Sequence, residues 1–255
     1  MSRILAGVQP VREAIRAHGR AVSWVCLQRG AARLAGLETL ARAQDISVRL
    51  VDKFELERLA KGNYHQGAVA EAPDLALLPF TSLLHQPPHL MLALDGVQDP
   101  QNFGATVRSA VGLGPAAVLW GENASAPLTA AMSRASAGAV EHARLCRVAS
   151  LGSALTDAIS EGYSVIGLDS HAPLALTDVN LKGPSILVVG GEGRGLSRQI
   201  RRACSQLASL VAPHSIDSLN ASVAAALALY EAQRQRQGVK GEGHESAPLA
   251  PSSIQ

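Results

Sequence analysis

Residues 92–110 read LALDGVQDPQNFGATVRSA, in which an apolar run ends in a carboxylate and a turn before a helical pattern begins. Polar groups that directly follow an apolar strand are typical of the ligand-binding edge of a parallel sheet. In this turn Asn102 offers amide donors and an acceptor, Gly104 permits close backbone approach, and Arg108 follows about one helical turn later. A capped amphipathic helix with a solvated arginine explains the same residues, so this stretch predicts an α/β fold and leaves its use open.

The alternation of strand and helix continues through the rest of the chain. Apolar runs predict strands over residues 89–94, 116–120, 165–169, 185–189 and 207–211. Helical spacing predicts helices over residues 103–113, 151–161, 197–204 and 218–236, the last with Leu219, Val223, Ala226, Leu227 and Tyr230 at helical spacing. This order predicts a mostly parallel sheet covered on both faces.

The first 72 residues have a pattern of their own. Pro10 can start a helix that Gly19 ends, and further helices are predicted over residues 31–43 and 54–60. Strands are predicted over residues 22–27 and 47–51, and HQGAVA at residues 65–70 leads into a last one. The pattern predicts a small α/β domain.

Proline content marks the predicted domain limits. Residues 73–88 carry four prolines, which favour a connector over a regular element. The predicted division is a domain at residues 1–72, a linker at 73–88, a second domain at 89–237 and a disordered Gly, Pro and Ser-rich tail at 238–255.

Charge is distributed unevenly along the chain. Residues 1–70 hold 11 Lys and Arg against 6 Asp and Glu, whereas the remainder is net acidic. A basic surface that meets a polyanion and an ordinarily solvated basic surface both fit this balance. Because aromatic residues make up only 3% of the chain, arginines, lysines and backbone groups would carry most nucleic-acid contacts.

Cysteine usage and hydropathy give the expected setting. The three cysteines lie far apart, with no spacing that suits a zinc site or a disulfide framework. No stretch is long and apolar enough for a membrane span or a signal core. We expect a soluble, cytoplasmic protein without a bound metal.

A glycine-rich stretch, ILVVGGEGRGLS, occupies residues 186–197. The dinucleotide pattern G-x-G-x-x-G fails here, because its sixth position is Leu196 when counted from Gly191 and Arg198 when counted from Gly193. No Gly-Lys-Ser/Thr follows, which excludes a P-loop. A nicotinamide oxidoreductase is therefore disfavoured, and what remains is an open turn that carries Glu192 and lets a flat ligand reach the main chain.

The last helix is preceded by SLNASVAA at residues 218–225. Ser218 is a natural N-cap, and cap chemistry alone explains it. Asn220 would lie in the first turn. Alanines at 221, 224, 225, 226 and 228 give the helix a small-residue face, of which a dimer interface is one use.

Taken together, three stretches resemble, in order and spacing, the motifs of the SpoU-type RNA ribose 2′-O-methyltransferases of the SPOUT superfamily. They are DPQNFGATVRSA, VVGGEGRGLS and SLNASVAA, with SRASAGAVEH at residues 133–142 similar to the segment between the first two. At the N-terminus, GVQPVREAIRA and HQGAVA resemble the RNA-binding domain of the RlmB-type enzymes, which methylate a guanosine in 23S rRNA.

The resemblance implies a fold, a cofactor and a site. The C-terminal domain would hold a deep trefoil knot, the N-terminal one would be like ribosomal protein L30e, and the catalytic unit would be a homodimer acting on rRNA, with no DNA or membrane partner. S-adenosyl-L-methionine would be held largely by backbone, at positions that match Leu168, Gly190, Gly191, Leu210 and Leu219. The positions that match catalysis and substrate placement are Arg108, Asn102, Glu192, Ser218 and Asn220.

The sequence departs from the family pattern at one place. Where the family has an Ile-Pro-Met strand end followed by glycine, this chain has Leu210 and then Val-Ala-Pro-His. A tRNA target, an rRNA-methylating resistance role and a non-catalytic RNA-binding or ribosome-assembly role stay open as alternatives. Because a guanidinium has a pKa of about 12.5 or more, we expect Arg108 to bind phosphate and stabilise charge rather than act as a base.

Overall fold

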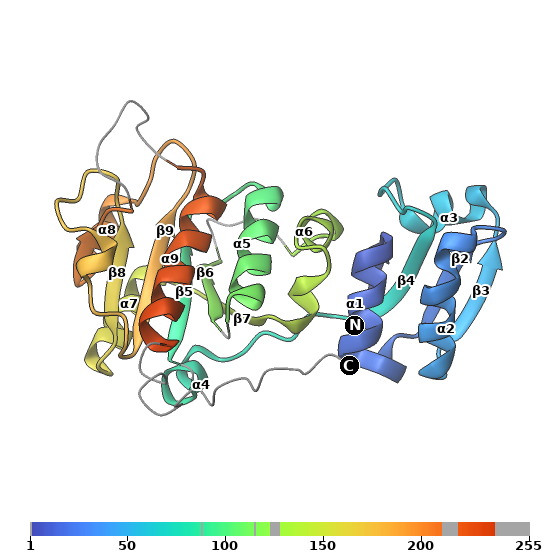
Figure 1. Cartoon of the computed structure of the whole chain (residues 1–255), viewed down its shortest axis with the longest axis horizontal. Coiled ribbons are helices and arrows are strands. Elements are labelled where there is room, and N and C mark those ends of the chain that lie inside the picture. The colour runs from blue at the N-terminus through green and yellow to red at the C-terminus, as the bar shows by residue number, and fades with distance from the viewer. Residues whose placement is uncertain (1, 88, 115, 123–127, 211–218, 238–255) are drawn as a thin grey trace, which may run out of the picture.

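The computed structural model describes residues 2–87, 89–114, 116–122, 128–210 and 219–237. Within these residues the strands of the sheets form one sheet of four strands and one of six. The two sheets lie toward opposite ends of an elongated molecule (Figure 1). The predicted α/β fold is confirmed.

The four-stranded sheet has the order β1-β4-β2-β3. Its strands are β1 (Ser2–Ala6), β2 (Trp24–Gln28), β3 (Ser47–Val51) and β4 (Ala68–Pro73). β2 and β3 are parallel, whereas β4 is antiparallel to β1 and β2. Strand β1 was not expected from the sequence, because only its last two residues are fully buried and its apolar pattern is therefore short.

Helices cover both faces of this sheet. On one face α1 (Val8–His18) and α2 (Ala35–Ala43) bury Val11, Ile15 and Leu37 in a single cluster. On the other face α3 (Lys53–Ala60) buries Leu56 against Cys26 and Val69. Residues 32–34, predicted as part of the second helix, form a separate 3-10 turn.

The six-stranded sheet is entirely parallel, with the order β10-β8-β9-β5-β6-β7. Its strands are β5 (Leu90–Asp95), β6 (Ala117–Gly121), β7 (Arg144–Val148), β8 (Ser164–Leu168), β9 (Ser185–Gly190) and β10 (Gln206–Ala208). The chain runs from β5 outward to β7 and then returns to the other half of the sheet. β5 and β9 are therefore neighbours at the point where the order reverses, which is where such sheets bind ligands.

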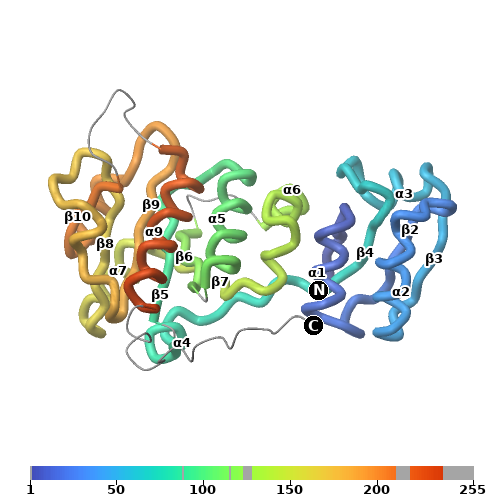
Figure 2. Tube along the Cα trace, in the orientation of Figure 1, coloured from blue at the N-terminus to red at the C-terminus, as the bar shows by residue number. Residues whose placement is uncertain are grey.

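Two groups of helices sandwich this sheet. On one face α5 (Pro100–Gly112) and α9 (Ala221–Gln237) lie side by side, as Figures 1 and 2 show, and bury Phe103 and Leu229. On the other face α4 (Phe80–His85), α7 (Leu151–Ser160) and α8 (Arg198–Ala203) bury Leu83, Leu155 and Ile200. No helix in the described ranges is long and apolar enough to cross a bilayer.

The proline-rich segment, predicted to lack regular structure, contains helix α4. Pro79 stands at its N-cap, a position whose missing N–H costs nothing, and Leu83 and Leu84 are buried. Leu78 donates its backbone N–H to the carbonyl of Leu145 at 2.7 Å. The prolines flank the helix rather than interrupt it, so the expectation that this segment holds no regular element was wrong for residues 80–85.

The sequence did not predict one strand of the larger sheet and one helix beside it. Strand β7 reads RLCRV, and because it lies at the sheet edge only its middle residues are buried. Helix α6 (Ala130–Ala135) has six residues, too few for a helical period to emerge. The last strand, predicted to residue 211, ends at Ala208, and residues 211–218 lie outside the described residues.

A buried carboxylate joins the two sheets. Glu141, in a 3-10 turn of residues 139–142, has a side chain that is 0% exposed. One of its oxygens accepts hydrogen bonds from Arg3 of β1 and, at 2.9 Å, from His18 of α1. Gly138 packs nearby, since a Cβ there would lie 2.8 Å from the Cβ of Glu13. These contacts fix the smaller sheet against the larger one.

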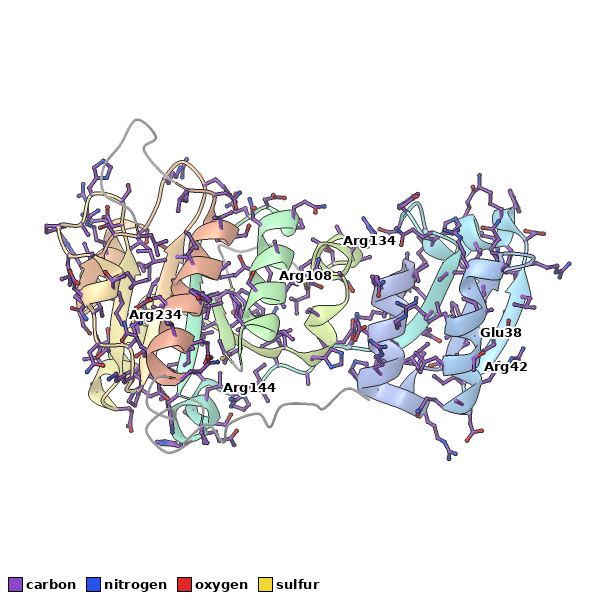
Figure 3. The ribbon with its side chains drawn as sticks, in the orientation of Figure 1. Glu38, Arg42, Arg108, Arg134, Arg144 and Arg234 are labelled. Carbon is purple, nitrogen blue, oxygen red and sulfur yellow. The ribbon has the colours of Figure 1, made fainter. Side chains whose placement is uncertain are left out.

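Replacing Arg3 by alanine is expected to lower the free energy of unfolding by about 2–3 kcal/mol, because a buried carboxylate loses its cationic donor. The matched control is Arg42→Ala, which removes an exposed pair with Glu38 on α2 (Figure 3) and costs about 0.5 kcal/mol or less. Denaturant unfolding measures both. Equal effects of the two substitutions would contradict the role of Glu141 at this junction.

Candidate functional site

The candidate site lies where β5 and β9 end. The loop after β9, residues 191–197, is called the glycine loop below. Its Gly191 N–H donates to the Asp95 carbonyl at 2.8 Å, and the Ser197 N–H donates to the Asp95 carboxylate at 2.6 Å. The loop also closes on itself through Gly195 N–H to Gly191 carbonyl at 3.0 Å. Both ends of the loop are thereby tied to the end of β5.

Two glycines make this packing possible. A Cβ on Gly190 would lie 2.1 Å from the carbonyl carbon of Gly195, and one on Gly191 would lie 2.4 Å from the carbonyl oxygen of Gly96. In both places the obstacle is backbone, so no side chain can move aside. These positions require glycine for close approach of main chain to main chain.

Three of the predicted residues meet above these strand ends. The amide nitrogen of Asn102 donates to the carboxylate of Glu192, and the amide nitrogen of Asn220 donates to the Asn102 oxygen at 3.0 Å. The Asn220 oxygen accepts from the backbone N–H of Ser222 at 2.9 Å and from its hydroxyl at 2.7 Å. A continuous chain of polar groups therefore links the start of α9, the start of α5 and the glycine loop.

The local structure corrects two expectations and specifies a third. Asn102 belongs to the first turn of α5, which Asp99 caps and Pro100 begins, rather than to a turn before it. Gly104 lies inside α5, where a Cβ would be 2.7 Å from the Met132 carbonyl, so the close backbone approach expected there is that of α6. Asn220 rather than Ser218 caps α9, and Ser218 lies outside the described residues.

Arg108 is not in this polar chain. It is exposed on α5, six positions after Asn102, which at about 3.6 residues per turn places the two side chains on different sides of the helix. Figure 3 labels Arg108 on the side of α5 toward α6. Within the described residues Arg108 makes no hydrogen bond or ion pair, so its charge is available to a partner.

The predicted cofactor positions fall mostly on one edge. Leu168, Gly190 and Leu210 stand at or just beyond the carboxyl ends of three adjacent parallel strands, β8, β9 and β10. Leu168 and Leu210 are partly buried and pack on the main core. Leu219 is 40% exposed ahead of α9 and is not among the residues of that core. Of the segment that departs from the family pattern, residues 211–214 lie outside the described residues.

Other reactive groups do not enlarge the site. Burial, with a smaller effect of the Asp95 charge, raises the pKa of Cys204 to about 11, so it is a neutral thiol at physiological pH. Within the described part of the chain no three His, Cys, Asp or Glu side chains gather as a metal site would need. A surface hollow lined by Leu113, His142 and Arg144 lies at the opposite end of α5.

Sequence reasoning missed Asp95 as the anchor of the glycine loop and Ser222 as the group that orients Asn220. The position of Asp95, directly after an apolar strand, was the available signal for the first. For Ser222 the signal was its place two residues after a cap-forming asparagine.

Comparison with known proteins places this geometry in a family. The SpoU rRNA Methylase family profile matches residues 89–230, and a profile named RNA 2'-O ribose methyltransferase substrate binding matches residues 4–77. A curated tRNA/rRNA methyltransferase of Mycobacterium avium, itself described as uncharacterized, is 37% identical over 91% of this chain and 77% of its own length. The chain therefore belongs to the SpoU rRNA methylase family, a class of RNA methyltransferases.

Solved structures agree with the fold. A crystal structure titled RNA 2'-O ribose methyltransferase is 27% identical, with a TM-score of 0.76, and the match covers 92% of this chain and 89% of that one. The SpoU methyltransferase AviRb from Streptomyces viridochromogenes, crystallised in complex with AdoMet, has a TM-score of 0.74 at 24% identity, with coverage of 93% and 91%.

Proposed function

We propose that this protein transfers a methyl group from S-adenosyl-L-methionine to a ribose 2′-hydroxyl of RNA. The observation that carries the proposal is the polar chain of Asn102, Glu192 and Asn220. Its three segments meet beside β5 and β9, where the strand order of the parallel sheet reverses. Such side chains suit the positioning of a sugar hydroxyl, and orientation supplies much of the rate gain in a group transfer.

The residues present fit this cofactor. Leu168 and Leu210 offer apolar contacts at adjacent strand ends, and Gly190 and Gly191 hold main chain close enough that any Cβ would fill the space. When bound, S-adenosyl-L-methionine supplies an electrophilic methyl group on a sulfonium. Gly190, Gly191, Leu168, Leu210 and Leu219 are the residues proposed to hold it.

The chain's own groups then divide the work. Asn102 and Asn220 hold the ribose, and Glu192 orients Asn102 through the hydrogen bond that joins them. Arg108 lies outside that polar chain, on another side of α5; it is proposed to bind the neighbouring phosphate with two parallel N–H donors and to stabilise the charge that develops on the 2′-oxygen. The proton of the hydroxyl passes to a phosphate oxygen or water, because a guanidinium is too weak a base. Ser218 completes the proposed substrate-placing set.

The N-terminal sheet is proposed to choose the RNA. The match to a substrate-binding profile and the basic excess of residues 1–70 support this. We propose 23S rRNA as the target, with a guanosine as the methylated nucleotide. The same proposal includes domain limits at residues 72 and 89, a fold of the smaller domain like that of ribosomal protein L30e, and a trefoil knot in the larger domain. The close crossing of the glycine loop and the loop after β5 supports the knot.

A homodimer is also proposed, through α9. The small-residue face suggested for this purpose packs largely inside the chain instead, with Ala221, Ala225 and Ala228 buried and Ala224 and Ala226 half-buried. The opposite side exposes a stripe of large apolar residues, Leu219, Val223, Leu227 and Tyr230. A second copy of this stripe would cover it symmetrically.

Replacing Leu227 by aspartate is expected to convert a dimer to a monomer, because the substitution places a charge at the centre of that stripe. Sedimentation measures the mass. The matched control is Ile159→Asp, which places the same charge on a solitary apolar residue of α7 that is 40% exposed. A wild-type protein that sediments as a monomer would overturn the dimer.

The proposed activity is tested by labelled methyl transfer to bulk rRNA and tRNA from a strain lacking the protein, followed by digestion to nucleosides. We expect 2′-O-methylguanosine from 23S rRNA. A product in tRNA alone would correct the target. A labelled protein or small molecule with RNA inert, or an absence of S-adenosyl-L-methionine binding in calorimetry, would overturn the activity, the latter in favour of a non-catalytic RNA-binding role.

A further inference from the structure

A loop of the N-terminal sheet has an unusual backbone. Residues 61–67, called the tyrosine loop below, connect α3 to β4. Lys61, Gly62, Gln66 and Gly67 all have positive φ, between 50° and 86°. Left-handed conformations at non-glycine residues such as Gln66 cost free energy and persist only where the surroundings hold them.

The surroundings do hold this loop. Asn63 donates its amide nitrogen to the Ala60 carbonyl at 2.8 Å, and His65 Nδ1 accepts the Gly67 N–H at 3.0 Å. Gln66 accepts two hydrogen bonds. Its side-chain oxygen accepts the Val8 N–H at 3.2 Å, and its backbone carbonyl accepts an N–H of Arg33 at 3.0 Å. Three of the loop's side chains thus serve its own structure.

Tyr64, between them, does not. Its side chain is 72% exposed, and it makes no hydrogen bond or ring contact within the described residues. A tyrosine ring is large and mostly apolar, so a ring left in solvent forgoes the free-energy gain of burial. A rigid loop therefore presents one free aromatic face to solvent.

The loop also has a fixed relation to the candidate site. Arg134 of α6 donates to the Asn63 oxygen at 2.9 Å, which ties the loop to the larger sheet. Helix α6 packs directly on α5 through Gly104, and Figure 3 places the labels of Arg134 and Arg108 on the side of α5 that faces the smaller sheet. One helix, α6, therefore separates the tyrosine loop from α5, the helix that carries the proposed phosphate site.

We propose that Tyr64 stacks on an unpaired base of the substrate RNA, next to the nucleotide that is methylated. This proposal rests on the proposed function. Single-stranded RNA is held by aromatic faces combined with cations along the backbone. Such cations are present on the tyrosine loop, where Lys61 is a loop residue and Arg33 and Arg134 donate hydrogen bonds to Gln66 and Asn63. The junction at Glu141 keeps the ring at a constant distance from the reaction.

The test compares Tyr64→Ala with Tyr64→Phe, which keeps the ring. For the alanine variant we expect the KM for RNA to rise about tenfold, the effect of losing one stacked base, at unchanged kcat and unchanged S-adenosyl-L-methionine affinity. The phenylalanine variant stays within about twofold of wild type. Since the side chain is exposed, both variants keep the wild-type unfolding midpoint.

A second measurement separates this proposal from the activity. Fluorescence anisotropy with a labelled single-stranded RNA of random sequence reports binding without chemistry. Loss of affinity in Tyr64→Ala but not Tyr64→Phe supports stacking, even if no RNA is methylated. If both variants are active, with the KM and RNA affinity of the wild type, the role of Tyr64 is overturned but the proposed methyl-transfer activity is not. Equal loss in both variants also overturns stacking, since the ring is then insufficient.

Discussion

Arg108→Ala is expected to lower the rate of methyl transfer about 100- to 1000-fold, the usual cost of removing one preorganised donor to a developing oxyanion. The side chain is exposed and has no partner within the described residues, so its removal disturbs neither the core nor an ion pair. S-adenosyl-L-methionine affinity and the unfolding midpoint should stay at wild-type values. Rapid-quench measurement of a single turnover isolates the step.

Arg108→Lys distinguishes the two roles that an arginine could have here. A lysine keeps the charge but loses the two parallel donors, so an electrostatic clamp predicts intermediate activity, about tenfold below wild type. If the residue were a base, the lower pKa of lysine would give the variant rates that rise with pH above those of wild type. Arg147→Ala, an exposed arginine on β7 paired with Glu122 at 3.7 Å, is the control for loss of positive charge. Near-normal turnover in Arg108→Ala would refute the catalytic role.

The sequence predicted those parts of the fold that depend on local pattern. Five of the six strands of the larger sheet were expected within a few residues of where they lie, because each combines an apolar run with a turn. Strand β7 was not predicted because two of its five residues, Arg144 and Arg147, are charged and break the apolar run at a sheet edge. Helix α4 was not predicted, because the prolines were interpreted as helix breakers, whereas in the structure they only flank the helix.

Side-chain roles depended on contacts that no local pattern contains. The meeting of Asn102, Glu192 and Asn220 was implied only by family resemblance, since more than a hundred positions separate the first from the last. The sequence indicated that Gly104 permits close backbone approach, but only the structure shows that the approaching backbone is that of α6. Glu141 was not singled out, because a carboxylate that joins two sheets has the same local sequence signal as one in solvent.

Gly190→Ala is the substitution with the largest expected structural effect at the site. The new Cβ would lie 2.1 Å and 2.2 Å from the carbonyl carbon and oxygen of Gly195 and 2.4 Å from the Leu196 nitrogen. Because all three atoms are backbone, the glycine loop must move as a whole, at a cost of about 1–3 kcal/mol. That movement separates Glu192 from Asn102. We expect S-adenosyl-L-methionine binding to fall beyond detection in calorimetry and methyl transfer with it.

The matched control is Gly183→Ala, where a Cβ meets nothing within 4 Å and the backbone is not left-handed. If Gly190→Ala fails to fold, Asp95→Ala reaches the same loop without a clash, because it removes the carboxylate that accepts the Ser197 N–H. This variant should bind the cofactor at least about tenfold more weakly, because the free energy needed to order the loop on binding is subtracted from the binding free energy. Wild-type cofactor affinity in a folded Gly190→Ala protein would mean that the cofactor is held elsewhere. The proposed roles of Leu168 and Leu210 would then fall as well, because they share that strand edge.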